Sequence, residues 1–314
     1  MPSAISLRGV SKTYGSVRAL QALDLDIPAG SVYGLLGPNG SGKTTTLRMI
    51  TAILLPDSGE ISIFGHPAGG NSRDLLSYLP EERGLYPKMK LAEQLVFFAR
   101  LKSVPRAEAE RRTRFWLERL ELAAWAARRV NELSKGMQQK AQFAVALLGD
   151  PKILILDEVT SGLDPVNAEL VREILLEQRA AGKTILFSTH RMEDAERICD
   201  AICLIATGRK LLDGDINQVR AGAGRKTARV EFRGDAGLLS QAPGVSQADL
   251  YGNYAELRLQ DPGRAPELLR WLAPRLEITH FELLQPTLNQ IFLDTVAQPA
   301  PEAVAAAGLE ASHA

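Results

Sequence analysis

The sequence predicts an α/β protein with a buried parallel sheet, followed by a small α+β module. Three short apolar runs, ILIL, TILFST and AICLIA, alternate with helix-like segments. Continuous apolar strands separated by helices are typical of a parallel sheet that helices cover on both faces. Further upstream, the strand-like run SVYGLLG leads into a glycine-rich loop. A helix-like segment, TTTLRMITAIL, follows the loop, and we expect it to end at Pro56.

The periodicity of the sequence changes along the chain and suggests its domains. In residues 1–220 an alternating start predicts antiparallel strands, and apolar residues three and four apart predict a helical subdomain at about 88–148. Residues 221–226 have the composition of a linker. Residues 227–296 predict the order β-α-β-β-α-β plus one helix, which is typical of a ferredoxin-like α+β module. The Pro/Ala-rich end at 297–314 is predicted to be disordered.

Composition limits the classes of function. The chain has 37 Lys plus Arg and 37 Asp plus Glu residues, so no overall field points to nucleic acid. Its longest apolar runs are far shorter than the ~20 residues of a membrane-spanning helix, and its start lacks the order of a signal peptide. We therefore expect a cytoplasmic protein. Cys199 and Cys203 lack neighbouring Cys or His clusters, so we expect small buried hydrophobic residues, not metal ligands.

The segment GPNGSGKT fits the phosphate-binding pattern G-x-x-x-x-G-K-[ST] between a strand and a helix. Glycines let backbone N–H groups approach phosphate oxygens, and the helix N-terminus adds a positive dipole end. Lys43 is expected to reach the β- and γ-phosphates, and the Thr44 hydroxyl to bind Mg²⁺. A mobile surface turn is the alternative. The predicted nucleotide-binding residues of this loop are Gly37, Pro38, Asn39, Gly40, Ser41, Gly42, Lys43, Thr44 and Thr45.

Carboxylates and a histidine follow two of the apolar strands. The run ILILDE ends in Asp157, which can hold the metal through water, and Glu158, which can orient and polarise the attacking water. Acids that merely cap a strand are the alternative. His190 closes the next strand in LFSTH, at the sheet edge where parallel sheets bind ligands. A lone histidine is more often structural, but this placement favours a catalytic role.

The segment LSKGMQQK predicts a second helix terminus suited to anions. Ser134 is a candidate N-cap, and Gly136 leaves the start of the helix open. A plain capped helix is the alternative, and the pattern alone does not exclude it.

Together these motifs resemble an ABC-type ATPase, the nucleotide-binding subunit of an ABC transporter. In that family GPNGSGKTT is the Walker A motif, ILILDE the Walker B motif, LSKGM the signature, SGLDP the D-loop and STH the switch histidine. The resemblance covers roughly residues 3 to 220. It implies a P-loop NTPase core with an N-terminal antiparallel β-subdomain and a helical signature subdomain, ATP hydrolysis, and ATP and Mg²⁺ as cofactors.

The resemblance also implies that one subunit does not complete its own site. Tyr14 falls where the family stacks a ring on adenine, although a turn tyrosine is the alternative. Ser134 and Gly136 would contact the γ-phosphate bound by a second subunit, and Asp164 would couple the two sites. We therefore expect a homodimer or a heterodimer with another ABC ATPase. A polytopic membrane permease would contact the region near Glu81 to Lys88 and the helices that follow it. This would place the protein peripherally on the cytoplasmic face of a bacterial plasma membrane.

Four positions depart from the family pattern. Glu81 replaces the usual glutamine of the Q-loop; it could approach Mg²⁺, but it adds negative charge beside phosphate. Lys135 and Met137 stand where Gly and Gln are commoner in the signature. Val159 replaces the proline that usually follows the catalytic glutamate, which would alter loop stiffness.

The run YLPEERGLYPKM and the extra C-terminal module resemble the bacterial sodium-extrusion (Nat-type) export ATPases. Two other classes remain as alternatives. A soluble ABC protein acting on ribosomes or DNA usually carries two cassettes or a long coiled coil, and this chain has one cassette and no run of heptads. A P-loop kinase would leave LSKGM and SGLDP unexplained. We expect no nucleic-acid partner.

Overall fold

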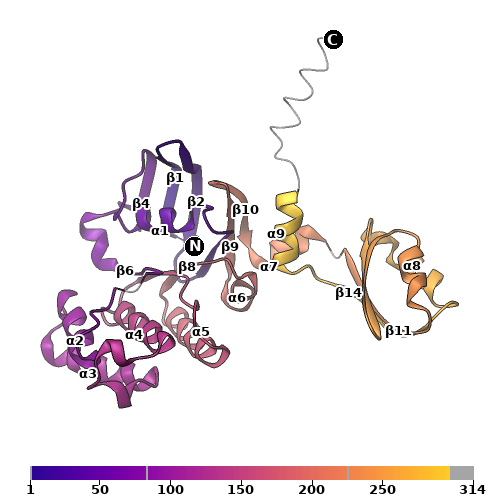
Figure 1. The fold of residues 1–314 in the computed structure, drawn as a ribbon. Coiled ribbons are helices and arrows are strands. Elements are labelled where there is room, and N and C mark those ends of the chain that lie inside the picture. Colours follow the sequence, from indigo (N-terminus) through magenta and orange to yellow (C-terminus); the bar gives the residue numbers. More distant parts are fainter. Residues whose placement is uncertain (1, 83, 225, 298–314) are drawn as a thin grey trace, which may run out of the picture. The chain divides into compact units, whose positions relative to one another are not determined.

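The computed structural model describes residues 2–82, 84–224 and 226–297. The chain divides into two compact units, Met1–Gly214 and Asp215–Ala314 (Figure 1). We predicted that the first domain ends at 220, but the second unit begins earlier, at Asp215. The reason is the helix α7 (Ile216–Ala223), which packs against α9 (Leu288–Ala297) of the second unit. Three residues of the predicted linker, 221–223, are therefore the end of α7. The predicted domain limits otherwise stay predictions, and all but Ala297 of the predicted tail lies outside the described residues.

The first unit contains the predicted parallel sheet. Its strand order is β10-β9-β3-β8-β7-β6, and β3 pairs in parallel with β8 and β9, while β7 pairs in parallel with β8 and β6. The central strands are buried throughout, which is why they read as continuous apolar runs. The strands are β3 (Val32–Leu36), β6 (Leu76–Leu79), β7 (Ile153–Asp157), β8 (Thr184–Thr189), β9 (Ala201–Ala206) and β10 (Arg209–Asp215).

The first unit also contains a four-stranded antiparallel sheet, with the strand order β2-β1-β4-β5. The sequence predicted antiparallel strands in this N-terminal part. Alternate residues of its strands are buried in one core together with α1 (Lys43–Ile50), which contacts both sheets. The core residues Leu47, Met49 and Ile50 of this helix fix the loop before it. The strands are β1 (Ser3–Tyr14), β2 (Val17–Pro28), β4 (Ser58–Ile63) and β5 (His66–Pro67).

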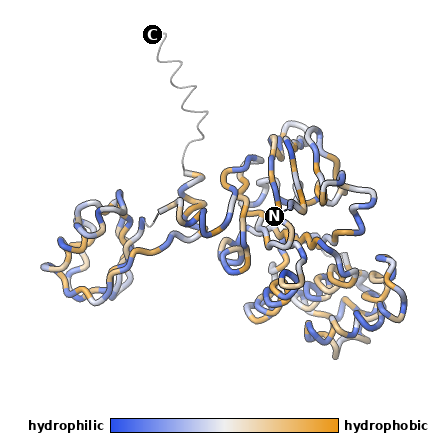
Figure 2. Tube along the Cα trace, turned by 180° about the vertical axis from the view of Figure 1, so that it is seen from behind, coloured by the Kyte–Doolittle hydropathy of each residue, from blue (hydrophilic) through white to orange (hydrophobic). Residues whose placement is uncertain are grey.

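Three helices form the predicted helical subdomain, and they contact one another (Figure 1). Figure 2 shows hydrophobic and hydrophilic residues alternating along them, as an amphipathic helix requires. They are α2 (Leu91–Leu101), α3 (Arg106–Arg119) and α4 (Lys135–Leu147). The remaining helical elements of the unit are η1 (Gly70–Leu75), η2 (Ala123–Trp125), η3 (Val130–Glu132), α5 (Pro165–Ala180) and α6 (Met192–Ile198). Across the described part of the chain, no helix is both long and apolar enough to cross a membrane.

The second unit has an antiparallel sheet in the order β12-β13-β11-β14. The first strand of the module lies between the third and the fourth, which is the ferredoxin-like arrangement that the sequence predicts. The first predicted helix is a short 3₁₀ helix, η4. The elements are β11 (Thr227–Arg233), η4 (Ala236–Gln241), β12 (Val245–Tyr251), β13 (Tyr254–Leu259), η5 (Pro262–Arg264), α8 (Ala265–Leu272) and β14 (Glu277–Leu284).

Candidate nucleotide-binding site

The glycine-rich loop joins β3 to α1 and has a backbone that only glycine fits at two positions. Gly37 has φ +151°, and a Cβ there would lie 2.1 Å from the Ile205 carbonyl oxygen. Gly42 has φ +110°, and its Cβ would lie 2.5 Å from the Ala19 carbonyl oxygen. Neither approach tolerates a side chain. The loop therefore passes close to the strand ends and turns its backbone toward the start of α1.

Lys43 begins α1 and is buried beneath the loop. Its Nζ donates hydrogen bonds to the Gly37 carbonyl oxygen at 2.7 Å and to the Pro38 carbonyl oxygen at 3.0 Å. Burial lowers the pKa of Lys43, and the negative charges of nearby carboxylates oppose that shift. The buried Ser41 Oγ in the same loop has no hydrogen-bond partner among the described residues. The loop thus holds a preorganised ammonium group and an unused hydroxyl.

A cavity of about 290 Å³ joins this loop to the carboxylates that follow β6 and β7. Glu81, Asp157 and Glu158 line it opposite the loop, so the structure brings together groups that are far apart in the sequence. Its lining residues are Ala19, Asn39, Gly40, Gly42, Lys43, Thr44, Thr45, Glu81, Asp157 and Glu158. Glu81, the acid in the predicted glutamine position, therefore does face the phosphate loop.

Glu158 and His190 form a hydrogen-bonded pair at the ends of neighbouring strands. Glu158 Oε1 lies 2.8 Å from His190 Nδ1 and also accepts the His190 backbone N–H at 3.1 Å. Glu158 has φ +51°, a strained value for a residue with a side chain, and its N–H donates to the Ser188 carbonyl oxygen at 3.2 Å. Its second oxygen, Oε2, is buried and has no hydrogen-bond partner among the described residues. One carboxylate oxygen is held, and the other is available for a substrate.

Asp157 ends β7 and is 1% exposed. Ser188 Oγ donates to its Oδ1, and Tyr78 Oη lies 3.5 Å from its Oδ2. Burial and the charge of Asp157 raise the pKa of Tyr78 to about 12, so this hydroxyl stays protonated. The sequence analysis missed both partners. The signal was a polar residue inside each of two otherwise apolar strands, LSYL and TILFST.

The donor set fits a magnesium ion. The Asp157 carboxylate, the Thr44 hydroxyl and the Glu81 carboxylate line one cavity and offer the hard oxygen atoms that would hold the ion. Among the described residues, no three His, Cys, Asp or Glu side chains gather into a metal cage. This agrees with the behaviour of Mg²⁺, which usually binds through one or two carboxylates, water and substrate phosphates.

The other predicted site residues are not among the described residues that line the cavity. Ser134 caps α4, where its Oγ accepts the Met137 N–H at 3.3 Å. A Cβ at Gly136 would lie 3.7 Å from Leu163, so the signature borders the SGLDP loop. Asp164 caps α5 by accepting the Asn167 N–H at 3.0 Å, and this bond lowers the pKa of Asp164.

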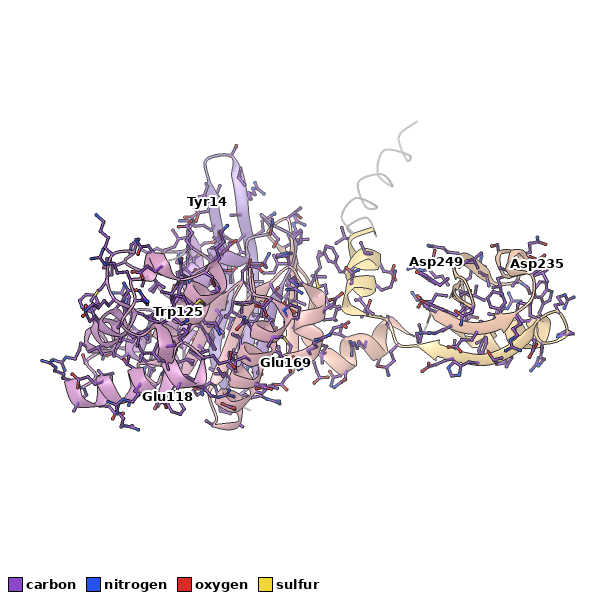
Figure 3. All side chains as sticks on the ribbon, turned by 60° about the horizontal axis from the view of Figure 1, so that its bottom comes forward. Tyr14, Glu118, Trp125, Glu169, Asp235 and Asp249 are labelled. Atoms are coloured by element: carbon purple, nitrogen blue, oxygen red, sulfur yellow. The ribbon has the colours of Figure 1, made fainter. Side chains whose placement is uncertain are left out.

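Tyr14 lies at the end of β1, at the tip of the hairpin with β2 (Figure 3), and is 48% exposed. Lys12 Nζ lies 5.9 Å from the centre of its ring. Tyr14 does not line the cavity beside the glycine loop.

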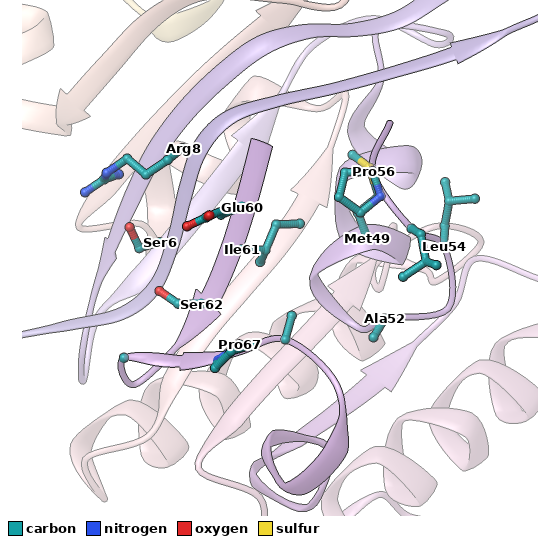
Figure 4. A pocket seen from close by; sticks show the side chains of 13 residues that line it. Ser6, Arg8, Met49, Ala52, Leu54, Pro56, Glu60, Ile61, Ser62 and Pro67 are labelled. Carbon is teal, nitrogen blue, oxygen red and sulfur yellow. The ribbon is translucent and has the colours of Figure 1, made fainter. Parts of the chain in front are cut away.

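A larger cavity, of about 490 Å³, lies elsewhere in the first unit (Figure 4). Polar residues of β1 and β4 such as Arg8 and Glu60 line one side, and apolar residues such as Met49 and Leu54 line the other. It contains none of the predicted nucleotide-binding residues. Size alone therefore does not identify the site; the glycine loop and the carboxylates do.

Comparisons with known proteins identify the family of the chain. A family model described as "ABC transporter" matches residues 20–161, and one described as "ATP-binding protein DrrA1-3-like, C-terminal domain" matches residues 214–296. The chain is 40% identical over 292 residues to the uncharacterized ABC transporter ATP-binding protein YhaQ of Bacillus subtilis, which covers 93% of this chain and 98% of that protein. It is 41% identical over 218 residues to the Nod factor export ATP-binding protein I of Burkholderia lata, covering 68% of this chain and 72% of that one.

Solved structures of ABC transporter ATP-binding proteins resemble this chain as well. An ATP-binding subunit of an ABC transporter has a TM-score of 0.66 at 32% identity and covers 71% of this chain and 94% of its own. The dimeric ATP-binding cassette MJ0796 bound to ADP and Pi has a TM-score of 0.63 at 27% identity and covers 68% of this chain and 98% of its own.

The fold and the glycine-loop site define a P-loop ATPase. The chain belongs to the family of ABC transporter ATP-binding proteins. The predicted ABC-type ATPase with an additional C-terminal domain is confirmed, as is the predicted fold class.

Proposed function

We propose that this chain is the ATP-hydrolysing subunit of an export transporter, and that it acts as a dimer closed around two MgATP. The main support for the proposal is that the nucleotide-binding cavity of one chain lacks the signature helix end. The cavity has a phosphate loop and catalytic acids, but the capped start of α4 with Ser134 and Gly136 does not line it. A second copy, or a related ABC ATPase, would supply that helix end to the γ-phosphate.

The geometry supports a role for several residues that line the cavity and for His190 beside it. Lys43 and the backbone of the loop bind the β- and γ-phosphates, and Thr44 and Asp157 hold the metal. When bound, Mg²⁺ offsets the charge on those phosphates. His190 holds Glu158 Oε1, and Glu158 Oε2 accepts a hydrogen bond and then a proton from the attacking water. The family resemblance assigns two further roles, with Tyr14 stacked on adenine and Asp164 coupling the two sites.

A groove between α2 and α3 supports docking of a separate polytopic membrane subunit. It has a volume of about 350 Å³ and includes Ala92, Val96 and Leu117 on its apolar side and Glu110 and Arg114 at its rim. The exposed Tyr86 and the ring of Phe98 stack 6.0 Å apart in the same subdomain. Such a surface suits a short amphipathic helix.

Export is proposed from the names of relatives such as the Nod factor export protein. With a membrane partner, the protein would lie peripherally on the cytoplasmic face of the plasma membrane. Cargo would be chosen by that partner.

The test is to purify the chain alone and together with a candidate polytopic membrane subunit. We expect co-purification, slow ATP hydrolysis by the chain alone, and faster hydrolysis in the complex. A substitution in the groove, Val96→Glu, should abolish the stimulation and leave the basal rate. Capture of ribosomes, with no stimulation by any membrane subunit, would favour the soluble alternative.

A further inference from the structure

Asp157 lies in β7 between two strands that each bring one hydroxyl to it. Ser188 of β8 is its direct partner in the parallel ladder. Tyr78 of β6 is paired with Ile155, two residues before Asp157 and therefore on the same face of the sheet. A tyrosine side chain is long enough to reach along the strand to the next position on that face. The sheet thus presents a hydroxyl from each side.

The two hydroxyls reach different oxygens of the carboxylate. Ser188 is fully buried, and its Oγ donates to Asp157 Oδ1. Tyr78 is half-buried, and its Oη lies 3.5 Å from Oδ2. The positive charge of Arg48, on the helix that follows the glycine loop, opposes the rise in the pKa of Tyr78.

A buried carboxylate whose hydrogen-bond donors are neutral hydroxyls is oriented but not neutralised. A carboxylate offers about four lone-pair positions, and these two bonds use one on each oxygen. Hydroxyls fix the plane of the group without cancelling its charge, whereas a cation would do both. Asp26 illustrates the contrast, because both of its oxygens accept the Arg8 guanidinium at 2.8 Å. Both partners of Asp157 are hydroxyls, so the carboxylate still has lone-pair positions left for further ligands.

We propose that Ser188 and Tyr78 are positioning residues that orient Asp157 for the metal–nucleotide complex. The proposal rests on the function proposed above, in which Asp157 holds Mg²⁺. The new element is the source of the hydrogen bonds to Asp157, which come from β6 and β8, the strands on either side of β7. Partners of this kind typically account for about 10- to about 100-fold in metal affinity.

The experiment measures nucleotide affinity with and without metal. A fluorescent, non-hydrolysable ATP analogue is titrated into the full chain in EDTA and again in Mg²⁺. In Ser188→Ala we expect the gain in affinity on adding Mg²⁺ to fall about tenfold, while the metal-free affinity is unchanged. Tyr78→Phe should lose less, in the same direction, because its contact is longer. A loss of affinity that is equal in both conditions, or no loss, would overturn the proposal.

Two control variants remove buried hydroxyls of the same kind elsewhere in the same sheet. Thr184, at the other end of β8, accepts the Gly30 N–H at 3.0 Å, and Tyr33 of β3 donates to Asp213. Thr184→Ala and Tyr33→Phe should cost stability but leave the gain from Mg²⁺ intact. If Ser188→Ala does not fold, Tyr78→Phe against Tyr33→Phe decides the question.

Asp157→Asn distinguishes a failure of the proposed metal role of Asp157 from a failure of the positioning role of Ser188 and Tyr78. If this variant keeps the gain from Mg²⁺, the metal role in the proposed function fails. If it loses the gain while Ser188→Ala and Tyr78→Phe behave like their controls, only the positioning role fails.

Discussion

His190 holds one oxygen of Glu158 twice, through Nδ1 at 2.8 Å and through its backbone N–H at 3.1 Å. The other oxygen, Oε2, is buried without a partner among the described residues. A free carboxylate would rotate and use either oxygen. Here the histidine fixes the group and leaves Oε2 as the oxygen that, in the proposed function, would meet the attacking water.

Glu158→Gln should reduce the steady-state ATPase rate by at least about 100-fold, because the amide cannot take a proton from water. The amide has the same shape, so nucleotide affinity should be nearly unchanged. The bound nucleotide should therefore hold a dimer together, which size-exclusion chromatography with ATP would detect. The exposed Glu60→Gln is the matched control and should turn over normally. A rate near the wild-type value would remove Glu158 from its catalytic role.

Gly42→Ala should prevent the glycine loop from closing. The new Cβ would lie 2.5 Å from the Ala19 carbonyl oxygen at φ +110°. We expect a loss of about 1–3 kcal/mol in the free energy of unfolding and loss of ATP binding, measured by chemical denaturation and by titration with a fluorescent nucleotide. Gly65→Ala is the control, since its φ is +79° but no atom lies within 4 Å of its Cβ. Normal ATP binding by Gly42→Ala would contradict the loop geometry.

The sequence predicted which polar residues would gather at one edge of the parallel sheet, because each lies at or after the end of a strand. The carboxyl ends of parallel strands meet at one edge, so Lys43, Asp157, Glu158 and His190 had to come close to one another. The hydroxyls of Tyr78 and Ser188 could not be predicted in the same way. Their contact with Asp157 depends on the register of three strands that are far apart in the chain.

The end of α1 was predicted wrongly for a local reason. We expected the helix to continue to Pro56, but it ends at Ile50. Ala52 takes φ +53°, and the N–H groups of Ile53 and Leu54 both bond the Arg48 carbonyl oxygen, at 2.9 and 3.0 Å. This helix ending usually carries glycine, and an alanine in the left-handed position gives no signal in the sequence.

Glu81→Gln should tighten nucleotide binding. Glu81 lines the cavity with Asp157 and Glu158, so three carboxylates face the site where a triphosphate would enter. Removing one charge should improve affinity about fivefold, or about 1 kcal/mol, and less at high salt. Titrations at two ionic strengths would measure this, with the neighbouring exposed Glu82→Gln as control. Weaker binding that appears only with Mg²⁺ would instead make Glu81 a metal ligand.

Lys102 should make stability depend on pH in the alkaline range. The residue as a whole is exposed, but its ammonium group donates to Ser77 Oγ and to the Val145 carbonyl oxygen, and burial lowers the pKa of Lys102 to about 8 from 10.5. Between these values the unfolded chain binds a proton that the folded chain has released, so this group makes the free energy of unfolding rise with pH. Below about 8 both states are protonated and the contribution is constant.

Denaturation of Lys102→Met at several pH values would test this, since the variant should lack the rise. The exposed Lys152→Met should keep it. A rise of equal size in Lys102→Met would show that another group causes it.

Substitutions at Ser134 distinguish two roles of this residue. It either only caps α4, or it also contacts the nucleotide bound by a second copy. Its Oγ accepts the Met137 N–H, so Ser134→Ala should cost about 1 kcal/mol of stability. Ser134→Asp keeps a good N-cap residue and should preserve the thermal midpoint. If Ser134 only caps α4, the aspartate variant will hydrolyse ATP normally. If it meets a γ-phosphate, the new charge will repel it, and both ATP-dependent dimerisation and turnover should fall about tenfold or more. Asp215→Ala, which removes the cap of α7, should lower stability without this loss, since that cap lies in the second unit.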